Sequence, residues 1–256
     1  MPRRLGQHFL SAPWVEKILR VIDPRPDDVF LEIGPGAGAL TFPLAARAER
    51  VVAVEVDRAL AARLRERAAP NVEIVAGDAL TVDLRALVPA GARVAGNLPY
   101  YISSPLLRRF LDLHGHVRDV HALLQEEVAR RIAAPPGSKE YGILSVAFAL
   151  RAETDLPLRV PPGAFRPPPQ VSSALLRARF LAAPREDVPD PDAFRRLVET
   201  AFARRRRTLE NNLQDSYLNL KEHLRLLNIE GSRRAETLSV AEFAALARAL
   251  EPVPRK

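Results

Sequence analysis

The sequence predicts an α/β fold, in which a parallel sheet is covered by helices on both faces and a small all-helical C-terminal domain follows. Two observations carry this prediction. Short apolar runs alternate with helical stretches over residues 29–124, which is the pattern of strands joined by right-handed crossover helices. Residues 182–191 are rich in proline and charge, which indicates a linker, and every signal beyond them is helical. A chain of 256 residues is long enough for both parts.

Five strands and two connecting helices are predicted in the first part. The strands are expected at residues 29–33, 51–55, 72–76, 93–97 and 120–125. The helices are expected at residues 39–48 and 58–67. Asp57 directly precedes the second helix and is its expected N-cap, because an aspartate side chain can accept hydrogen bonds from the first free N–H groups of a helix.

The pattern changes after residue 140. A helix is expected at 141–150, and two strands at 156–160 and 173–180 flank a proline-rich loop. Because no crossover helix fits between these strands, we expect them to be antiparallel and to lie at the edge of the sheet.

The linker divides the chain into an expected α/β domain of residues 1–186 and a helical domain of residues 187–256. Two stretches of the second domain, 192–204 and 239–250, carry apolar residues at helical spacing. We expect a monomer, because no strong self-association pattern is present.

The composition excludes several classes of function. The chain has no cysteine, which rules out disulfides, thiolate metal sites and cysteine nucleophiles, and its five histidines have no metal-ligand spacing. No apolar run approaches the roughly 18 residues of a membrane span, and residues 1–7 are no secretory signal, so a cytoplasmic protein is expected. The formal charge of +7 suits a polyanionic partner such as nucleic acid; a protein that is merely basic is the alternative.

Gly34, Gly36 and Gly38 lie between the first strand and its helix. Glycines let the backbone turn sharply and approach a ligand closely. Their spacing is G-x-G-x-G, with Ala39 where a dinucleotide-binding loop would have its third glycine, and this favours S-adenosylmethionine over a dinucleotide. The alternative is a tight turn without a ligand.

The next two strands each end at an acidic residue. Glu55 is placed to accept hydrogen bonds from two ribose hydroxyls of a cofactor. Asp78 can accept one from the cofactor's adenine amine, and Ala79 leaves room for the ring. The alternatives are a solvated charge at Glu55 and an ordinary turn residue at Asp78.

The fourth strand leads into Asn97-Leu98-Pro99-Tyr100. The exocyclic amine of adenine is a poor nucleophile, because its lone pair is delocalised into the ring. The Asn97 side-chain oxygen and the Leu98 carbonyl can accept its hydrogens, Pro99 stiffens the loop, and Tyr100 offers a face for the base. Positioning supplies most of the acceleration in such a site. The alternative is a proline turn with a buried tyrosine.

Several segments occur together in one order along the chain: GQHFL at 6–10, EIGPG at 32–36, Glu55, GDA at 77–79, NLPY at 97–100 and FRPPPQVSS at 165–173. In this combination the sequence resembles the rRNA adenine dimethyltransferase family over nearly its whole length. The resemblance implies a Rossmann-like class I methyltransferase sheet. It also implies transfer of two methyl groups from S-adenosylmethionine to N6 of an adenine, with S-adenosylhomocysteine as the other product.

The resemblance also assigns further site residues. It implies that Gln7, His8 and Leu10 lie over the methionine part of the cofactor. It implies that Phe165 stacks on the target adenine opposite Tyr100, which requires a loop base or an extruded one. Many relatives have Asn where this chain has His8, and Asn where it has Tyr101.

Arg204, Arg205, Arg206 and Arg207 form the densest basic run. Arginines suit phosphate contacts, which set affinity and not sequence preference, so these residues are the expected RNA contacts. The alternative is a solvated, salt-bridged helix end.

The resemblance is strongest to the branch that dimethylates two adjacent adenines near the 3′ end of small-subunit ribosomal RNA during ribosome assembly. Three alternatives remain open from the sequence. They are a resistance-type methyltransferase of large-subunit RNA, a non-catalytic ribosome-assembly factor and a nicotinamide-dependent dehydrogenase.

Overall fold

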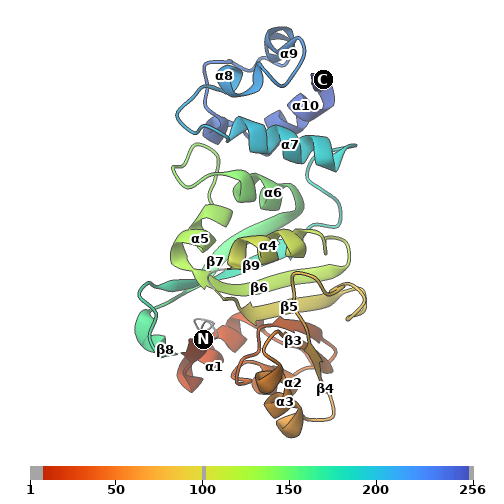
Figure 1. Cartoon of the computed structure of the whole chain (residues 1–256), viewed down its shortest axis with the longest axis vertical. Helices are drawn as coiled ribbons and strands as arrows, with labels where there is room; N and C mark the ends of the chain where they lie inside the picture. The colour runs from red at the N-terminus through yellow and green to blue at the C-terminus, as the bar shows by residue number, and fades with distance from the viewer. Residues whose placement is uncertain (1–7, 100–101, 254–256) are drawn as a thin grey trace. The chain divides into compact units, whose positions relative to one another are not determined.

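The computed structural model describes residues 8–99 and 102–253 (Figure 1). It divides into two compact units. Unit 1 holds the chain up to Ala129 together with Glu153–Phe180, and unit 2 holds Arg130–Ala152 together with the chain from Leu181 onward. This division differs from the one expected at residue 186, because residues 130–152 belong with the helical part.

A seven-stranded sheet forms most of unit 1, in the order β4-β3-β2-β5-β6-β9-β7. Its strands are β2 (Val29–Ile33), β3 (Arg50–Glu55), β4 (Val72–Ala76), β5 (Ala92–Asn97), β6 (Val117–Gln125), β7 (Ala152–Val160) and β9 (Ser173–Phe180). The first five are parallel to one another, as the sequence predicts. β9 runs antiparallel to β6, and β7 is the edge strand beyond it.

Capping side chains and turns set the bounds of the helices of unit 1. α3 (Arg58–Arg67) matches its predicted bounds, and the Asp57 carboxylate caps it by accepting from Ala59 N and Leu60 N. α2 (Thr41–Ala45) is shorter than expected, because residues 36–40 form turns after the glycine loop. Further helices are α1 (Ala12–Ile22), α4 (Ser103–Leu111) and α5 (Glu126–Ile132), the last of which spans the chain boundary between the units.

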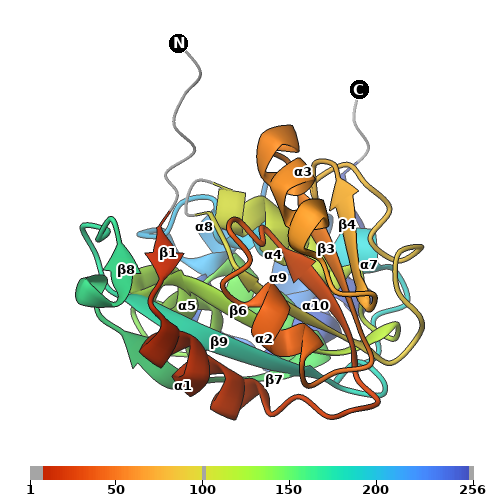
Figure 2. The same cartoon turned by 90° about the horizontal axis from the view of Figure 1, so that it is seen from below.

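Helices α1, α2 and α3 pack on the same face of the sheet (Figure 2). α1 and α2 share a buried cluster with Phe30 and Val51, and α3 packs against Ala53, which lies two residues along the same strand as Val51. Every residue of β5 up to Gly96 is buried, so the sheet is covered on both faces. No helix among the described residues is long and apolar enough to span a bilayer.

A second, two-stranded sheet joins distant parts of the chain. β1 (Phe9–Leu10) pairs antiparallel with β8 (Phe165–Arg166), so that Leu10 faces Phe165. β8 lies in the proline-rich loop between β7 and β9, after a 3₁₀ turn at Pro162–Ala164. This pairing holds the N-terminal segment, which we call the arm (residues 8–11), against that loop.

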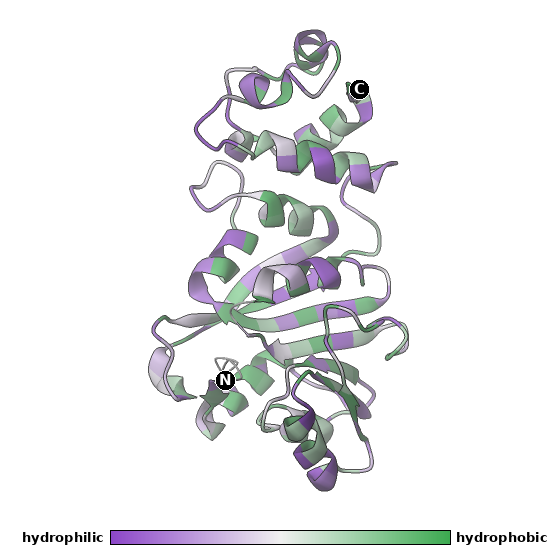
Figure 3. Cartoon of the chain, in the orientation of Figure 1, coloured by the Kyte–Doolittle hydropathy of each residue, from purple (hydrophilic) through white to green (hydrophobic). Residues whose placement is uncertain are grey.

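Unit 2 is helical and has its own core. It contains α6 (Ile143–Arg151), α7 (Pro191–Ala201), α8 (Leu209–Leu213), α9 (Leu220–Leu226) and α10 (Val240–Ala249), with a 3₁₀ turn at Ala235–Thr237. Its buried cluster includes Tyr141, Leu197, Leu213 and Phe243. α7 ends at Ala201, so the four arginines lie in the following loop, which is hydrophilic in Figure 3.

The amino ends of the central strands are joined by a buried ion cluster around Arg93, the second residue of β5. Arg93 Nη1 donates to Asp28 Oδ2 over 2.7 Å, and Arg93 Nε donates to Asp119 Oδ1 over 2.9 Å. Its remaining donors reach the carbonyls of Ile22 and Asp23 at the end of α1. One side chain therefore ties together α1, β2, β5 and β6.

The two carboxylates of this cluster are held in their charged form. Burial alone would raise the pKa of Asp28, but hydrogen bonds from Arg25 N–H, Arg93 and Arg118 outweigh it and lower the pKa. Burial is likewise outweighed at Asp119, where interactions with His121 and Arg93 lower the pKa. Stability from these groups is present at neutral pH and is lost as the pH falls through their lowered pKa values.

Replacement of Arg93 by methionine is expected to lower the free energy of unfolding by about 3–5 kcal/mol, because it removes the guanidinium that two buried carboxylates share. Urea unfolding at neutral pH measures this change. Arg50→Met is the matched control, since Arg50 forms an exposed ion pair with Glu73 and such pairs contribute about 1 kcal/mol or less. Equal losses in the two variants would contradict the role given to Arg93.

Candidate functional site

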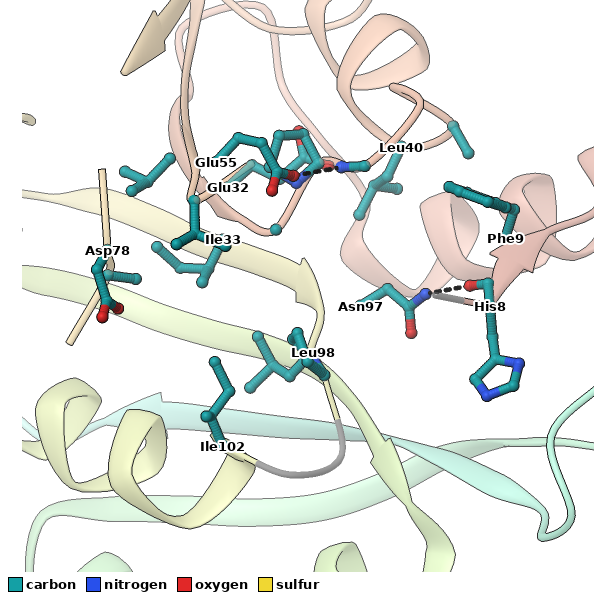
Figure 4. A pocket seen from close by; sticks show the side chains of 18 of the residues that line it. His8, Phe9, Glu32, Ile33, Leu40, Glu55, Asp78, Asn97, Leu98 and Ile102 are labelled. Atoms are coloured by element: carbon teal, nitrogen blue, oxygen red, sulfur yellow. Dashed lines mark hydrogen bonds between the residues drawn. The ribbon is translucent and has the colours of Figure 1, made fainter. Parts of the chain in front are cut away.

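The carboxyl ends of β2, β3, β4 and β5 open into a cavity that the arm borders on one side (Figure 4). Ten of the sequence-predicted site residues line it: His8, Leu10, Gly34, Gly36, Glu55, Asp78, Ala79, Asn97, Leu98 and Pro99. Gln7 and Tyr100 lie outside the described residues. The structure therefore brings the glycine loop and the Asn97 turn to one shared space.

The glycine loop requires its glycines for two different reasons. Gly34 and Gly36 have φ of 70° and 59°, in the left-handed region that side chains disfavour. A Cβ on Gly36 would also lie 3.3 Å from the Phe9 ring. Gly38 is not among the residues that line the cavity, and its ligand role stays a prediction. A Cβ there would clash with the Phe42 ring, so Gly38 serves the packing of α2.

Glu55 ends β3 and is nearly fully buried. Its Oε2 accepts from Gly36 N over 3.0 Å, and its Oε1 accepts from Asp57 N over 2.9 Å. The carboxylate thus braces the glycine loop against the start of α3. Because each carboxylate oxygen can accept more than one hydrogen bond, both oxygens keep capacity for a ligand's hydroxyls.

Asp78 and Ala79 follow β4 at the opposite end of the cavity from the arm. Asp78 Oδ1 accepts from Leu80 N over 2.9 Å, which fixes the side chain in a local turn. The Asp78 side chain borders the cavity, and Ala79 beside it is buried. The second oxygen of Asp78 therefore stays available at the cavity rim.

The Asn97 turn directly faces the glycine loop. A Cβ placed on Gly34 would lie 3.8 Å from the backbone oxygen of Asn97 and 3.8 Å from Pro99 Cδ. Leu98 N donates to Leu123 O on β6, and Pro99 O accepts from Ile102 N at the start of α4. These backbone bonds hold the turn on both sides.

Gly96, immediately before the turn, was not selected from the sequence. A Cβ there would lie 2.6 Å from the Ile33 carbonyl oxygen of β2. A glycine at this place allows β5 and β2 to approach closely just below the site. A glycine near the end of a buried strand is the signal that indicates such an approach.

Phe165 is fully buried in the same cluster as α1 in this structure, and its stacking on a target adenine stays a prediction. The cause of the burial is the pairing of β8 with β1, which sets Leu10 opposite Phe165. The His8 ring meets it edge-on, with ring centroids 6.4 Å apart. In this arrangement Phe165 anchors the proline-rich loop by packing into the core of unit 1.

Glu32 is the penultimate residue of β2, lines the cavity, and was given no separate role from the sequence. It is 2 % exposed, and the described residues offer no hydrogen-bond partner to its Oε2. Burial, with a smaller contribution from the Glu55 charge, raises its pKa to about 8 against a lowering by Thr41. The Glu32 carboxyl is therefore mostly neutral at pH 7.

The polar lining of the cavity is acidic. Glu55 and Asp78 line it with carboxylates, the Glu32 carboxyl beside them is mostly neutral at pH 7, and no lysine or arginine is found among its described lining residues. Such a site suits a cationic ligand with hydroxyl or amine donors, and it offers a pyrophosphate no charged partner. The described residues contain no group of His, Asp or Glu that could hold a metal ion.

The four arginines of unit 2 lie in the exposed loop between α7 and α8. Arg205 is paired with Glu236 and also donates to the carbonyl of Lys139. For Arg204, Arg206 and Arg207, the described part of the chain provides no side-chain partner. The basic run thus divides into one structural arginine and three that face solvent.

Residues 2–251 match the family described as ribosomal RNA adenine dimethylase. The chain belongs to this family. It is 48 % identical to "Ribosomal RNA small subunit methyltransferase A" of Geobacter metallireducens, over 97 % of this chain and 94 % of that protein. The protein of the same name from Leptothrix cholodnii is 45 % identical, over 98 % and 93 % of the two chains.

Solved structures share the fold, which is that of class I methyltransferases. The crystal structure of 23S rRNA methyltransferase ErmE has a TM-score of 0.74 at 28 % identity, over 94 % of this chain and 99 % of that one. A dimethyladenosine transferase from Plasmodium falciparum has a TM-score of 0.77 at 23 % identity, over 93 % and 96 % of the two chains. The expected Rossmann-like sheet with a helical C-terminal part is confirmed.

Glu32→Gln is expected to flatten the pH dependence of stability. The folded state keeps the Glu32 proton up to a pKa of about 8, whereas the ordinary value for this carboxyl is 4.5. Between these values unfolding releases a proton, so the free energy of unfolding falls as the pH rises through this window. A glutamine side chain does not titrate, and the substitution removes that fall.

Urea unfolding at several pH values between about pH 5 and pH 9 measures the effect. Glu73→Gln, which changes an exposed carboxylate on β4, is the matched control and should keep the parent profile. A Glu32→Gln variant with the parent's pH profile would show that Glu32 ionises normally in the folded protein.

Proposed function

We propose that this protein transfers methyl groups from S-adenosylmethionine to N6 of two adjacent adenines near the 3′ end of small-subunit ribosomal RNA. The observation that carries the proposal is the shared cavity, in which the Gly34 loop and the Asn97 turn face each other so closely that a Cβ on Gly34 would contact the turn. Membership of the ribosomal RNA adenine dimethylase family supports the substrate class.

The cavity lining fits this cofactor by its chemistry. S-adenosylmethionine carries a sulfonium, an ammonium group and ribose hydroxyls, and the lining offers the carboxylates of Glu55 and Asp78 with no cation among its described members. We assign Glu55 to the ribose hydroxyls and Asp78 to the adenine amine. His8 and Leu10 border the methionine end, together with Gln7 from the sequence. The bound cofactor supplies an electrophilic methyl group.

The Asn97 turn holds the target amine. The side-chain oxygen of Asn97 and the carbonyl of Leu98 accept its two hydrogens, so that the nitrogen lone pair is freed from the ring and directed toward the cofactor. Pro99 restricts the turn, and Tyr100 provides the stacking face by the sequence argument. Because no charged base is needed before transfer, fixed dipoles and positioning carry the rate.

The small-subunit target is favoured over the large-subunit one by the degree of similarity. Relatives at 45 % and 48 % identity are named small subunit methyltransferases, whereas the 23S rRNA methyltransferase ErmE stands at 28 %. Arg204, Arg206 and Arg207 are the proposed phosphate contacts, and they make unit 2 the RNA-holding part of the chain. The intact Asn97 turn argues against a non-catalytic assembly factor.

The purified protein is expected to place two methyl groups on each of two adjacent adenines of unmethylated small subunits, and none on large subunits. Mass spectrometry of nuclease digests after reaction measures this. Asn97→Ala should lower the transfer rate by about a hundred-fold or more, the usual loss when one group that stabilises a transition state is removed. Modified large-subunit RNA would refute the target, and near-parent turnover by the Asn97→Ala variant would refute the role of Asn97.

Asn71→Ala is the matched control for that experiment, because Asn71 bonds the carbonyls of Ala45 and Ala48 away from the cavity. It is expected to keep transfer once the folded fraction is taken from its melting curve. RNA affinity of the Asn97→Ala variant should stay close to that of the parent.

Replacing Arg204, Arg206 and Arg207 together by glutamine is expected to weaken binding to ribosomal RNA and to reduce its salt dependence. Each lost phosphate contact lowers the slope of log affinity against log salt by about 0.7–0.9. Filter binding at several salt concentrations measures both quantities. Arg195→Gln is the control, because Arg195 on α7 is paired with Asp192 and Glu199. An unchanged slope in the triple variant would place the RNA surface elsewhere.

A further inference from the structure

The side-chain amide of Asn97 is held by the arm. Its Nδ2 donates to the backbone carbonyl of His8 over 2.9 Å (Figure 4). The nitrogen and oxygen of an amide lie on opposite sides of its carbon, so this bond also sets the direction of Oδ1. Figure 4 shows Oδ1 turned away from the His8 carbonyl. The orientation that methyl transfer requires of Asn97 is thus imposed from outside the turn.

The acceptor on the arm is itself fixed. The His8 ring nitrogen Nδ1 lies 2.7 Å from the carbonyl oxygen of Pro167. Because a carbonyl can only accept, Nδ1 carries the proton in this bond. The next two residues of the arm pair with β8, Phe9 opposite Arg166 and Leu10 opposite Phe165. The His8 carbonyl is therefore held between a ring contact on one side and a strand on the other.

We propose that His8 is a positioning residue that acts through Asn97: its ring anchors the arm to Pro167, and its carbonyl selects the Asn97 rotamer that presents Oδ1 to the target amine. This inference rests on the proposed function. It differs from a contact between the His8 side chain and the cofactor, because the ring is engaged with the proline-rich loop.

The physical basis is a choice between two amide orientations. If the Asn97 amide were rotated by about 180°, Oδ1 would face the His8 carbonyl oxygen, and Nδ2 would face the target amine. Two acceptors would then oppose each other at the arm, and two donors would oppose each other at the base. A carbonyl cannot donate, so its position excludes this orientation in a way that a hydroxyl or a water could not.

The first test is a double-mutant cycle on the single-turnover rate at saturating cofactor and RNA. His8→Ala is expected to lower the rate about three- to ten-fold, the range for the loss of one hydrogen bond. His8→Asn should restore it, because an asparagine Nδ2 occupies the position of a histidine Nδ1. Asn97→Asp removes the donor to the His8 carbonyl. In that background His8→Ala should have almost no further effect.

The alternatives give different results. Independent losses, in which the double variant shows the product of the two single fold-changes, would overturn the proposal. A His8→Ala defect that saturating cofactor removes would also overturn it, since that pattern belongs to a cofactor-binding side chain. A parent protein without any methyl transfer would instead refute the proposed function, and the second test remains valid in that case.

The second test does not use activity. In ¹⁵N-labelled protein without cofactor, the two Asn97 Nδ2 protons are identified by their loss in Asn97→Ala. One of them should exchange slowly with water in the parent and in His8→Asn, and several-fold faster in His8→Ala. His116→Ala is the matched control, because the His116 ring also bonds a backbone carbonyl, that of Val88, over 2.9 Å. Equal exchange in parent and His8→Ala would overturn the proposal.

Discussion

The buried contact of Arg93 with Asp28 and Asp119 is the constraint on which the arrangement of unit 1 depends. It joins the amino ends of β2, β5 and β6 and the last turn of α1 through one guanidinium. β2 and β5 carry Glu32 and Asn97 at their other ends. Each of these strands is only five to nine residues long. The register fixed at the amino ends of the strands therefore also sets the relative positions of their carboxyl ends, where the cavity lies.

At the carboxyl ends of the strands, hydrogen bonds between neighbouring loops determine the shape of the cavity. Glu55 braces the glycine loop against α3. The Asn97 turn is bonded to β6 and α4. The arm places the Phe9 ring beside Gly36 of the glycine loop, and it bonds the Asn97 turn through the His8 carbonyl and the proline-rich loop through the His8 ring. A segment of a few residues thus couples three loops whose chemistry differs.

The sequence was sufficient where local physics decides the outcome. The bounds of β2 and α3 and the Asp57 cap follow from apolar runs and capping alone. The sequence was not sufficient where the position of a residue depends on a packing partner that is distant in the chain. A helix at α6 could be predicted, but not that Val146 and Leu150 bury against the helices of unit 2. Phe165 beside prolines suits stacking or packing equally, and its burial opposite Leu10 depends on a pairing between segments far apart in the sequence. The ion cluster joins Arg93 of β5 and Asp119 of β6 to Asp28, which directly precedes β2, and no single window of sequence contains all three.

The close approach of β2 and β5 at Gly96 has a consequence for how such a site can change its substrate. Adjacent strands are about 4.8 Å apart wherever they are hydrogen-bonded, and the glycine loop and the Asn97 turn leave the sheet from two adjacent strands. Under the proposed function, the distance between the methyl donor and the methyl acceptor is therefore set by the geometry of the sheet. It is the same in any sequence that keeps these two strands side by side. New nucleobase preferences must arise from side chains around a reaction distance that the backbone does not allow to vary.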